Sequence, residues 1–339
     1  MFGALGRRAG GLGLLPGGGG GALPLIGLGF THPALSFARA SAAALLRSTD
    51  GALVEVGSGV QRYDPTFGLL LEGQRTNSIR NPRAEGAVPG TPGTMPTNWS
   101  LGTSNLSASG ITGSVEATGT SLGRPWVRIR LTTFGANTTS ASSANILFDG
   151  TFPAAAQNQL WTVAALCRIE AGSTSGFSLF GPRVRTMEAG GSVQTASASP
   201  DFKGSVSGSW GRYVATVTAP VDGAQVTALA SGLWQFNWNT GVPIEITFDI
   251  ALPQLELASM ESSLILPASG TPATTTRLAD TLSTPLSSLS LPATGECTLY
   301  GTLMIPKATG TNTRQIIAQM DDGTTSNQWV LRCPGSAST

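Results

Sequence analysis

The stretch Ile244-Glu-Ile-Thr-Phe-Asp-Ile250 decides the fold class, because apolar and polar residues alternate along it without a break. This period of two places the apolar side chains on one face of a β-strand and the polar ones on the other. Upstream, Trp126-Val-Arg-Ile-Arg-Leu131 repeats the pattern. Further strand-like segments, separated by turn-forming residues, lie at 160–169, 211–218 and 233–238. Many short alternating strands predict an all-β fold, with a jelly-roll β-sandwich over residues 81–268.

On the N-terminal side of the sandwich, residues 30–80 predict a small connecting module. Leu53–Val56 and Leu69–Leu71 have the pattern of short strands, and Asp50-Gly51 has that of a turn. Strands this short are not stable alone, so they need the next domain or a neighbouring subunit, and we expect a homo-oligomer. The charged residues of the module form either an ion-paired junction or separate solvated charges; they are Arg39, Arg62, Glu72 and Arg75.

The two ends of the chain differ in composition from the sandwich. Residues 1–29 form a glycine-rich arm with scattered leucines, which we expect to be extended, without regular helix and packed on a partner. Residues 269–284 are rich in proline, alanine and threonine and predict a linker. Residues 285–339 resemble the start of a lectin-like sandwich of the concanavalin or laminin-G type. This piece is too short to close two sheets over a core, so it predicts a partial β-domain or strands completed by other subunits.

Composition and charge argue against several classes of function. Charged residues make up 12% of the chain and the net charge is +1, so nothing favours nucleic acid as a partner. No apolar run reaches the roughly 18 residues that a membrane-spanning helix needs, so no membrane insertion is expected. His32 is the one histidine and the three cysteines lie far apart, which argues against His-based catalysis and multi-histidine metal sites. We therefore expect no enzymatic activity and no certain cofactor.

Several motifs resemble a family of tailed-phage structural proteins. They are Phe37-Ala-Arg-Ala-Ser41, Tyr63-Asp-Pro65, Gly68-Leu-Leu-Leu-Glu-Gly-Gln-Arg-Thr-Asn77 and Thr275-Thr-Arg-Leu-Ala-Asp280. Members of that family are head spikes, head fibres or tail fibres of phages and of gene transfer agents. The resemblance implies a structural protein on the virion surface, assembled in the host cytoplasm and attached to other virion structural proteins through residues 1–80. For such an appendage we expect binding of host cell-surface polysaccharide. Fibres are usually trimers, so we expect a homotrimer, with a five-fold arrangement as the alternative.

The block that begins at residue 81 also resembles jelly-roll carbohydrate-binding modules. The resemblance rests on Asn81-Pro-Arg-Ala-Glu-Gly86, Trp99, Trp210-Gly-Arg-Tyr213 and Phe248-Asp-Ile-Ala-Leu-Pro-Gln-Leu-Glu256. It implies the sandwich fold and a task in carbohydrate binding. Two alternatives stay open: a capsule depolymerase or accessory module whose catalytic part lies beyond residue 339, and a structural connector without a ligand.

The aromatic residues of one predicted strand are the candidate sugar site. Trp234, Phe236 and Trp238 alternate along it and so share a face. An exposed face would be a platform on which sugar rings stack, whereas a buried face would be core, the more frequent position of such aromatics. The resemblance to carbohydrate-binding modules also implies a structural calcium between Glu85 and Asp249, with backbone carbonyls as further ligands. Surface charge is the alternative for these two carboxylates.

Overall fold

A computed structural model describes most of the central part of the chain and short stretches near its ends. The described residues are 12–16, 23–27, 30–31, 33, 35–134, 137–189, 194–220, 228–285, 297–301, 315–321 and 328–333. The chain divides into two compact units, Met1–Leu303 and Met304–Thr339. Within the described ranges no helix is long and apolar enough to cross a membrane.

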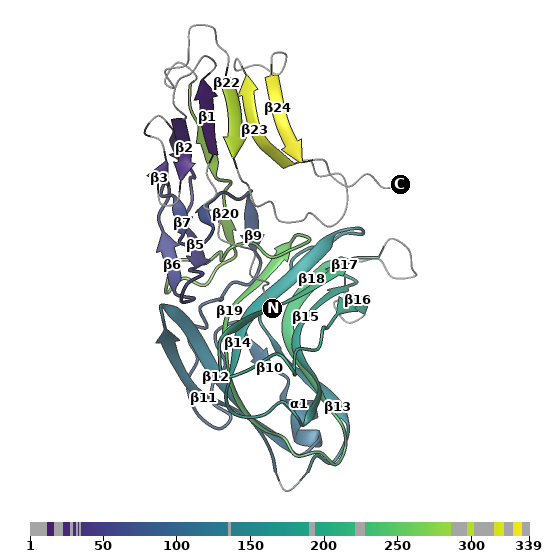
Figure 1. Ribbon diagram of the computed structural model, residues 1–339. Helices are drawn as coiled ribbons and strands as arrows, with labels where there is room; N and C mark the ends of the chain where they lie inside the picture. Colours follow the sequence, from purple (N-terminus) through teal and green to yellow (C-terminus); the bar gives the residue numbers. More distant parts are fainter. Residues whose placement is uncertain are drawn as a thin grey trace. The chain divides into compact units, whose positions relative to one another are not determined.

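Two five-stranded antiparallel sheets form a β-sandwich, as the alternating patterns predict (Figure 1). The first sheet has the order β11-β12-β19-β14-β17 and the second the order β10-β13-β18-β15-β16. The strands are β10 (Ser100–Leu101), β11 (Ile111–Ser121), β12 (Arg124–Thr133), β13 (Ser142–Leu147), β14 (Leu160–Gly172), β15 (Phe177–Met187), β16 (Gln194–Ala198), β17 (Gly211–Thr218), β18 (Leu229–Trp238) and β19 (Glu245–Leu257). A short helix, α1 (Thr103–Ala108), follows β10. The all-β fold class is therefore confirmed.

The main core lies between the facing sides of the two sheets. β19 contributes Ile246, Phe248 and Ile250 at alternate positions, and all three are fully buried. β18 faces them with Phe236, whose ring centroid lies 6.4 Å from that of Phe248. The free thiol of Cys167 is buried in the same core, and this burial raises its pKa well above the usual value. The prediction from the period-2 pattern is thus confirmed for this face: the apolar side of the strand is covered by the other sheet.

Several predicted strands match the observed ones closely. β17 coincides with the predicted residues 211–218, and β6 (Leu53–Val56) coincides with its predicted range. β19 continues beyond Ile250 to Leu257, and its residues from Ile246 to Glu256 are buried without alternation. A strand loses its alternation where both of its faces are covered, so another part of the chain must lie on the outer face of the first sheet.

That cover is the connecting module, which packs on the sandwich through a second, smaller core. In the module, β5 (Ala43–Leu46) pairs with β6, and Gly51 in the turn between them has φ +69°, as the Asp50-Gly51 turn predicts. The hairpin places Ala44 against Leu166 and Ala251 of the first sheet. The sandwich therefore supplies the apolar surface that these short strands need. The expected homo-oligomer consequently rests on the family resemblance and not on a missing core.

The segment predicted to be a linker returns to this module and pairs with it. β20 (Thr275–Arg277) pairs with β9 (Arg75–Asn77), and β21 (Thr281–Ser283) pairs with β4 (Ser36–Ala38). The module also contains the hairpin of β7 (Arg62–Asp64) and β8 (Gly68–Leu70). Residues far apart in the sequence thus meet as neighbouring strands, although their composition is that of a linker.

The described parts of the two chain ends are also strands. β1 (Leu12–Pro16), β2 (Leu23–Gly27), β3 (Phe30–Thr31) and β22 (Cys297–Gly301) form a four-stranded sheet of order β22-β1-β2-β3. The described part of the arm is therefore extended, as expected. In the smaller unit, β23 (Gln315–Asp321) pairs with β24 (Gln328–Cys333). His32 lies outside the described residues, and the lectin-like domain over residues 285–339 stays a prediction.

Candidate functional site

The aromatic residues of β18 lie in the core and not on an exposed platform. Trp234, Phe236 and Trp238 have exposed fractions of 0%, 0% and 1%. The Trp234 ring packs edge-on against Phe180 at 5.4 Å, and the indole nitrogen of Trp238 donates a 3.0 Å hydrogen bond to the carbonyl of Ser140. Side chains enclosed between two sheets cannot stack on a sugar. The platform expected on these residues is therefore wrong, and the core alternative holds for all three.

The two carboxylates expected to share a calcium ion are satisfied by separate protein groups. Asp249 is fully buried and accepts from Arg128 at 2.7 Å and from Arg168 at 2.8 Å. Glu85 accepts through Oε1 from the backbone nitrogen of Gly270 at 2.8 Å. Two guanidinium groups already neutralise Asp249, which leaves it unsuited to a cation. Among the described residues no group of three or more His, Cys, Asp or Glu side chains is placed to hold a metal ion.

The opposite side of β18 carries polar side chains on the outer face of the second sheet. Gln235 alternates with the inward-facing Trp234 and Phe236, so the strand period turns it to the outer face, where it is 7% exposed. In register it lies opposite Asn145 of β13, while on β15 Arg183 lies opposite Leu233. This outer face was not predicted as a site, because amide and arginine side chains are common on the side of a strand that faces away from the core.

Hydrogen bonds link the polar side chains of this outer face into one row. Arg183 donates through Nη1 to Oε1 of Gln235 at 2.7 Å, and its Nη2 donates to Gln194 of β16. Gln235 in turn donates to Oδ1 of Asn237 at 2.7 Å. Arg185 lies two residues beyond Arg183 on β15 and therefore shares its face. We call Arg183, Arg185, Gln194, Gln235 and Asn237 the arginine–amide face.

The two arginines of the arginine–amide face are partly desolvated. Burial lowers the pKa of the Arg183 guanidinium, and the positive charge of Arg185 lowers it further. Burial also lowers the pKa of Arg185. Both groups keep their charge at neutral pH, because arginine loses its proton only far above that range. The face therefore presents two positive charges beside neutral amides.

A shallow hollow elsewhere on the sandwich is too small for a sugar chain. It has a volume of about 90 Å³ and is lined by Ser78, Arg80, Thr151, Phe152, Pro153 and Thr274. Small-molecule pockets usually enclose about 300–1,000 Å³. Arg80 at its wall is engaged by Asp149, with a 2.7 Å ion pair. The hollow is therefore unsuited to an extended polymer.

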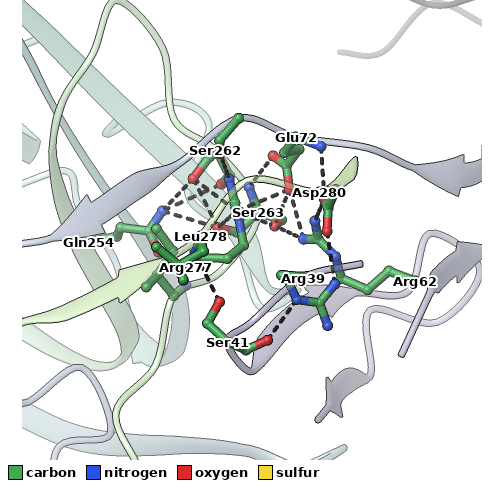
Figure 2. A network of polar contacts seen from close by, with 12 residues as sticks. Arg39, Ser41, Arg62, Glu72, Gln254, Ser262, Ser263, Arg277, Leu278 and Asp280 are labelled. Carbon is green, nitrogen blue, oxygen red and sulfur yellow. Dashed lines mark hydrogen bonds and ion pairs between the residues drawn. The ribbon is translucent and has the colours of Figure 1, made fainter. Parts of the chain in front are cut away.

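The predicted ion-paired junction exists, and it is buried (Figure 2). Asp280 accepts from Arg39 at 2.9 Å and also pairs with Arg62. Glu72 accepts from Arg62 at 2.7 Å and from Arg277 at 3.0 Å. We call these five residues the arginine junction. The junction alternative is therefore confirmed for Arg39, Arg62 and Glu72.

Arg75, the remaining residue expected in the junction, is not part of it. Its side chain is exposed and donates to the neighbouring carbonyl of Gln74 at 3.2 Å. Arg277 and Asp280 take part instead, although neither was predicted to. Their positions in the Thr275–Asp280 motif were the available signal, and only the pairing of β20 with β9 brings them to Glu72.

Serine and glutamine side chains connect the arginine junction to the sandwich (Figure 2). The backbone nitrogen of Ser263 donates to Glu72 at 2.9 Å, and Arg277 donates to the Ser263 hydroxyl at 2.8 Å. Gln254 of β19 accepts from the nitrogen of Ile265 at 2.9 Å. Burial would raise the pKa of Glu72, but Arg277, Ser263 and Arg62 together outweigh it and hold the pKa below the ordinary value. The junction is a structural lock between module and sandwich.

Comparison with known proteins gives distant similarities only. No protein-family model and no curated protein matches the chain. A solved carbohydrate-binding module of the β-sandwich superfamily is 13% identical with a TM-score of 0.34, over 73% of this chain and 84% of that one. A cyclase from Fischerella sp. TAU is 12% identical with a TM-score of 0.35, over 56% and 100%. The enzymatically active domain of tailspike protein 4 from bacteriophage CBA120 is 12% identical with a TM-score of 0.29, over 47% and 19%.

These similarities describe a β-sandwich that distantly resembles carbohydrate-binding modules and a phage tailspike domain. Because binding modules and an enzyme match at the same low level, the comparisons carry no argument about function. The case for a function must come from the residues of this chain.

Proposed function

We propose that this chain is an appendage of a phage or phage-like particle, a head spike, head fibre or tail fibre, that binds host cell-surface polysaccharide. The observation that carries the binding role is the arginine–amide face. Amide and guanidinium groups offer planar sets of donors and acceptors, which suit the paired hydroxyl groups of a sugar ring. The row from Arg183 through Gln235 to Asn237 is held in place by its own hydrogen bonds, so little order is lost on binding.

The arginine junction supports the assignment of residues 1–80 to attachment. Three of the four motifs that resemble phage structural proteins contribute to it, with Arg39 from the first, Glu72 from the Gly68–Asn77 motif, and Arg277 and Asp280 from the last. The resemblance therefore rests on residues that lock the connecting module to the sandwich. Such a lock suits a protein that is held to a particle at one end and meets the host with another part.

A glycan array with the full chain tests the binding role. We expect binding to host surface polysaccharide that Arg183→Ala abolishes. The matched control is Arg130→Ala on the first sheet, where Arg130 pairs with Glu245 at the surface, and this variant should bind like the unchanged protein. Absence of any glycan binding by the unchanged protein would contradict the proposal.

A structural connector without a ligand is the second candidate, and the arginine junction favours it, because a rigid lock serves a spacer equally well. Failure on the array together with normal incorporation into particles would select it. A depolymerase would instead release reducing sugars from host capsule. Electron microscopy of particles carrying a labelled chain tests the virion location.

A further inference from the structure

We infer that the arginine–amide face takes an acidic polysaccharide, one that carries carboxylate or sulfate groups. The inference rests on the proposed function and adds the chemical class of the ligand. It starts from the charges of Arg183 and Arg185, which stand about 7 Å apart along β15 at ~3.3 Å per residue. Within the described residues, neither arginine forms an ion pair with a carboxylate.

Other arginines of the sandwich show the contrast. On the outer face of the first sheet, Arg128 and Arg168 share Asp249, and Arg130 pairs with Glu245 at 2.8 Å. Among the described residues Arg183 instead donates only to neutral oxygens: those of Gln235, Gln194 and Ser197. The described part of the chain gives Arg185 neither a hydrogen bond nor an ion pair. These three arginines are compensated by carboxylates, whereas within the described residues Arg183 and Arg185 are not.

Polar atoms without hydrogen-bond partners lie around these two arginines. Within the part of the chain that the structure describes, the Nε atoms of Arg183 and Arg185 are buried without a hydrogen-bond partner, and so is the hydroxyl of Ser231, which lies opposite Arg185 in register. The nearest carboxylate in sequence is that of Glu188, three residues after Arg185, and within the described residues it forms no ion pair with either arginine. Asp201 is the next carboxylate along the chain. Asp201 is engaged by Lys203 and by the backbone of Phe180.

Arg185 is half-buried, and an anionic group on the ligand would pair with its guanidinium group. A partly desolvated cation without a counter-ion is unfavourable, and an anion that pairs with it removes that cost. The guanidinium fork matches a carboxylate or a sulfate with two parallel hydrogen bonds. Arg183 is held by Gln235 and Gln194, which fixes its orientation, while Arg185 is free to receive the anion. The neutral amides are then left for sugar hydroxyls.

The test compares charged polysaccharides with their neutral counterparts on the full chain. The carboxylate arm uses polygalacturonate against its methyl ester, and the sulfate arm uses dextran sulfate against dextran. We expect tighter binding to at least one charged member than to its neutral counterpart, with affinity falling as salt rises. Arg185→Gln should weaken that binding about tenfold, since it removes a charge-assisted hydrogen bond.

Variant controls keep the result interpretable. Arg185→Gln should fold normally, because the described structure gives its side chain no bonds to lose, and an unchanged melting temperature checks this. Arg130→Gln removes the same charge from the other sheet and should leave binding unchanged. Arg185→Lys should bind more tightly than Arg185→Gln but less tightly than the unchanged protein, because lysine keeps the positive charge but lacks the planar fork of donors.

Three outcomes would overturn the inference, and they differ in what they mean for the proposed function. Binding of neutral glycans with no preference for charge would overturn the acidic ligand alone. Equal binding of single-stranded DNA would assign the face to polyanions in general. Absence of binding to every polysaccharide would remove both the inference and the binding role.

Discussion

Single positions on β18 show how strongly the strand period decides the role of a residue. Trp234 is fully buried, while its neighbour Gln235 takes part in the hydrogen-bonded row on the outer face. A shift of one residue would exchange these positions, because successive side chains of a strand point to opposite faces. The aromatic residues therefore serve stability, and the polar residues between them lie on the outer face, where Gln235 is hydrogen-bonded to the half-buried Arg183.

Replacement of the buried indole tests this division. Trp234→Ala should lower the free energy of unfolding by about 3–5 kcal/mol, since it leaves a cavity among Phe180, Tyr213 and their neighbours. Urea unfolding followed by circular dichroism measures the change. Phe134→Ala is the control, because this ring is 86% exposed and its loss should change stability little. A Trp234→Ala variant that is stable but binds glycan poorly would contradict this division and support the hypothesis of a stacking platform.

The carboxylate of Glu72 predicts a pH dependence of stability. Its pKa in the folded protein is lower than the ordinary value of 4.5, so the unfolded chain takes up the proton first as pH falls. The stabilisation is therefore complete above about pH 4.5 and is lost as pH falls through the lower folded-state pKa.

Stability measurements from pH 7 to pH 3 on the unchanged protein and on Glu72→Gln check this prediction. The variant should be less stable at pH 7, and the difference should shrink at acidic pH. A difference that stays constant over the whole range would contradict the role assigned to Glu72.

At the scale of elements, short strands distant in sequence depend on one another. β9 is completed by β20, and β4 is completed by β21, so the connecting module contains strands from both sides of the sandwich. Two-stranded ribbons of this length have little stability of their own. The arginine junction and the second core hold them on the first sheet.

Loss of Asp280 should therefore loosen the connecting module while the sandwich stays folded. Asp280→Asn removes the counter-ion of Arg39 and Arg62 in a buried site, a change that typically costs about 3–5 kcal/mol. Hydrogen exchange should accelerate in β4 to β9, with protection retained in β14 and β19. The control is Asp50→Asn, since Asp50 forms an exposed pair with Arg47 and such pairs contribute little. Uniform loss of protection throughout the chain would show that module and sandwich unfold together.

For the whole molecule, the expected assembly is a homotrimer that carries its glycan faces on a particle. Weak contacts to single glycans gain strength when several copies bind together. Mass photometry of the full chain at micromolar concentration should give about 104 kDa, three times the 34.6 kDa chain. A species near 34.6 kDa would contradict the trimer, and a five-fold species would support the alternative arrangement.

Attachment is the other prediction at this scale. Deletion of residues 2–29 should leave the sandwich folded, because the described strands of the arm, β1 and β2, belong to neither of its two sheets, while incorporation into particles is lost. Immunoblotting of purified particles measures incorporation, and circular dichroism of the soluble variant checks the fold. Normal incorporation of the shortened chain would place the attachment site elsewhere.

Alternation along 244–250 and 126–131 was enough to predict the all-β class and several strand positions, because a strand period is a local property of the chain. The period also identified which residues of 233–238 share a face. It did not identify which of the two faces is buried, since that depends on where the other sheet lies. α1 was not predicted, because a helix of one or two turns has no stripe to detect.

Long-range contacts alone decided the rest. The extra burial of β19 follows from the hairpin on its outer face, and the arginine junction joins residues more than 200 positions apart in the sequence, such as Arg62 and Asp280. Asp249 and Glu85 were paired from a resemblance, whereas the sheet register places Asp249 between Arg128 and Arg168. The local pattern determines which side chains lie on the same face of a strand. Only the tertiary structure determines what covers that face, because burial and ion pairing depend on residues that are distant in the sequence.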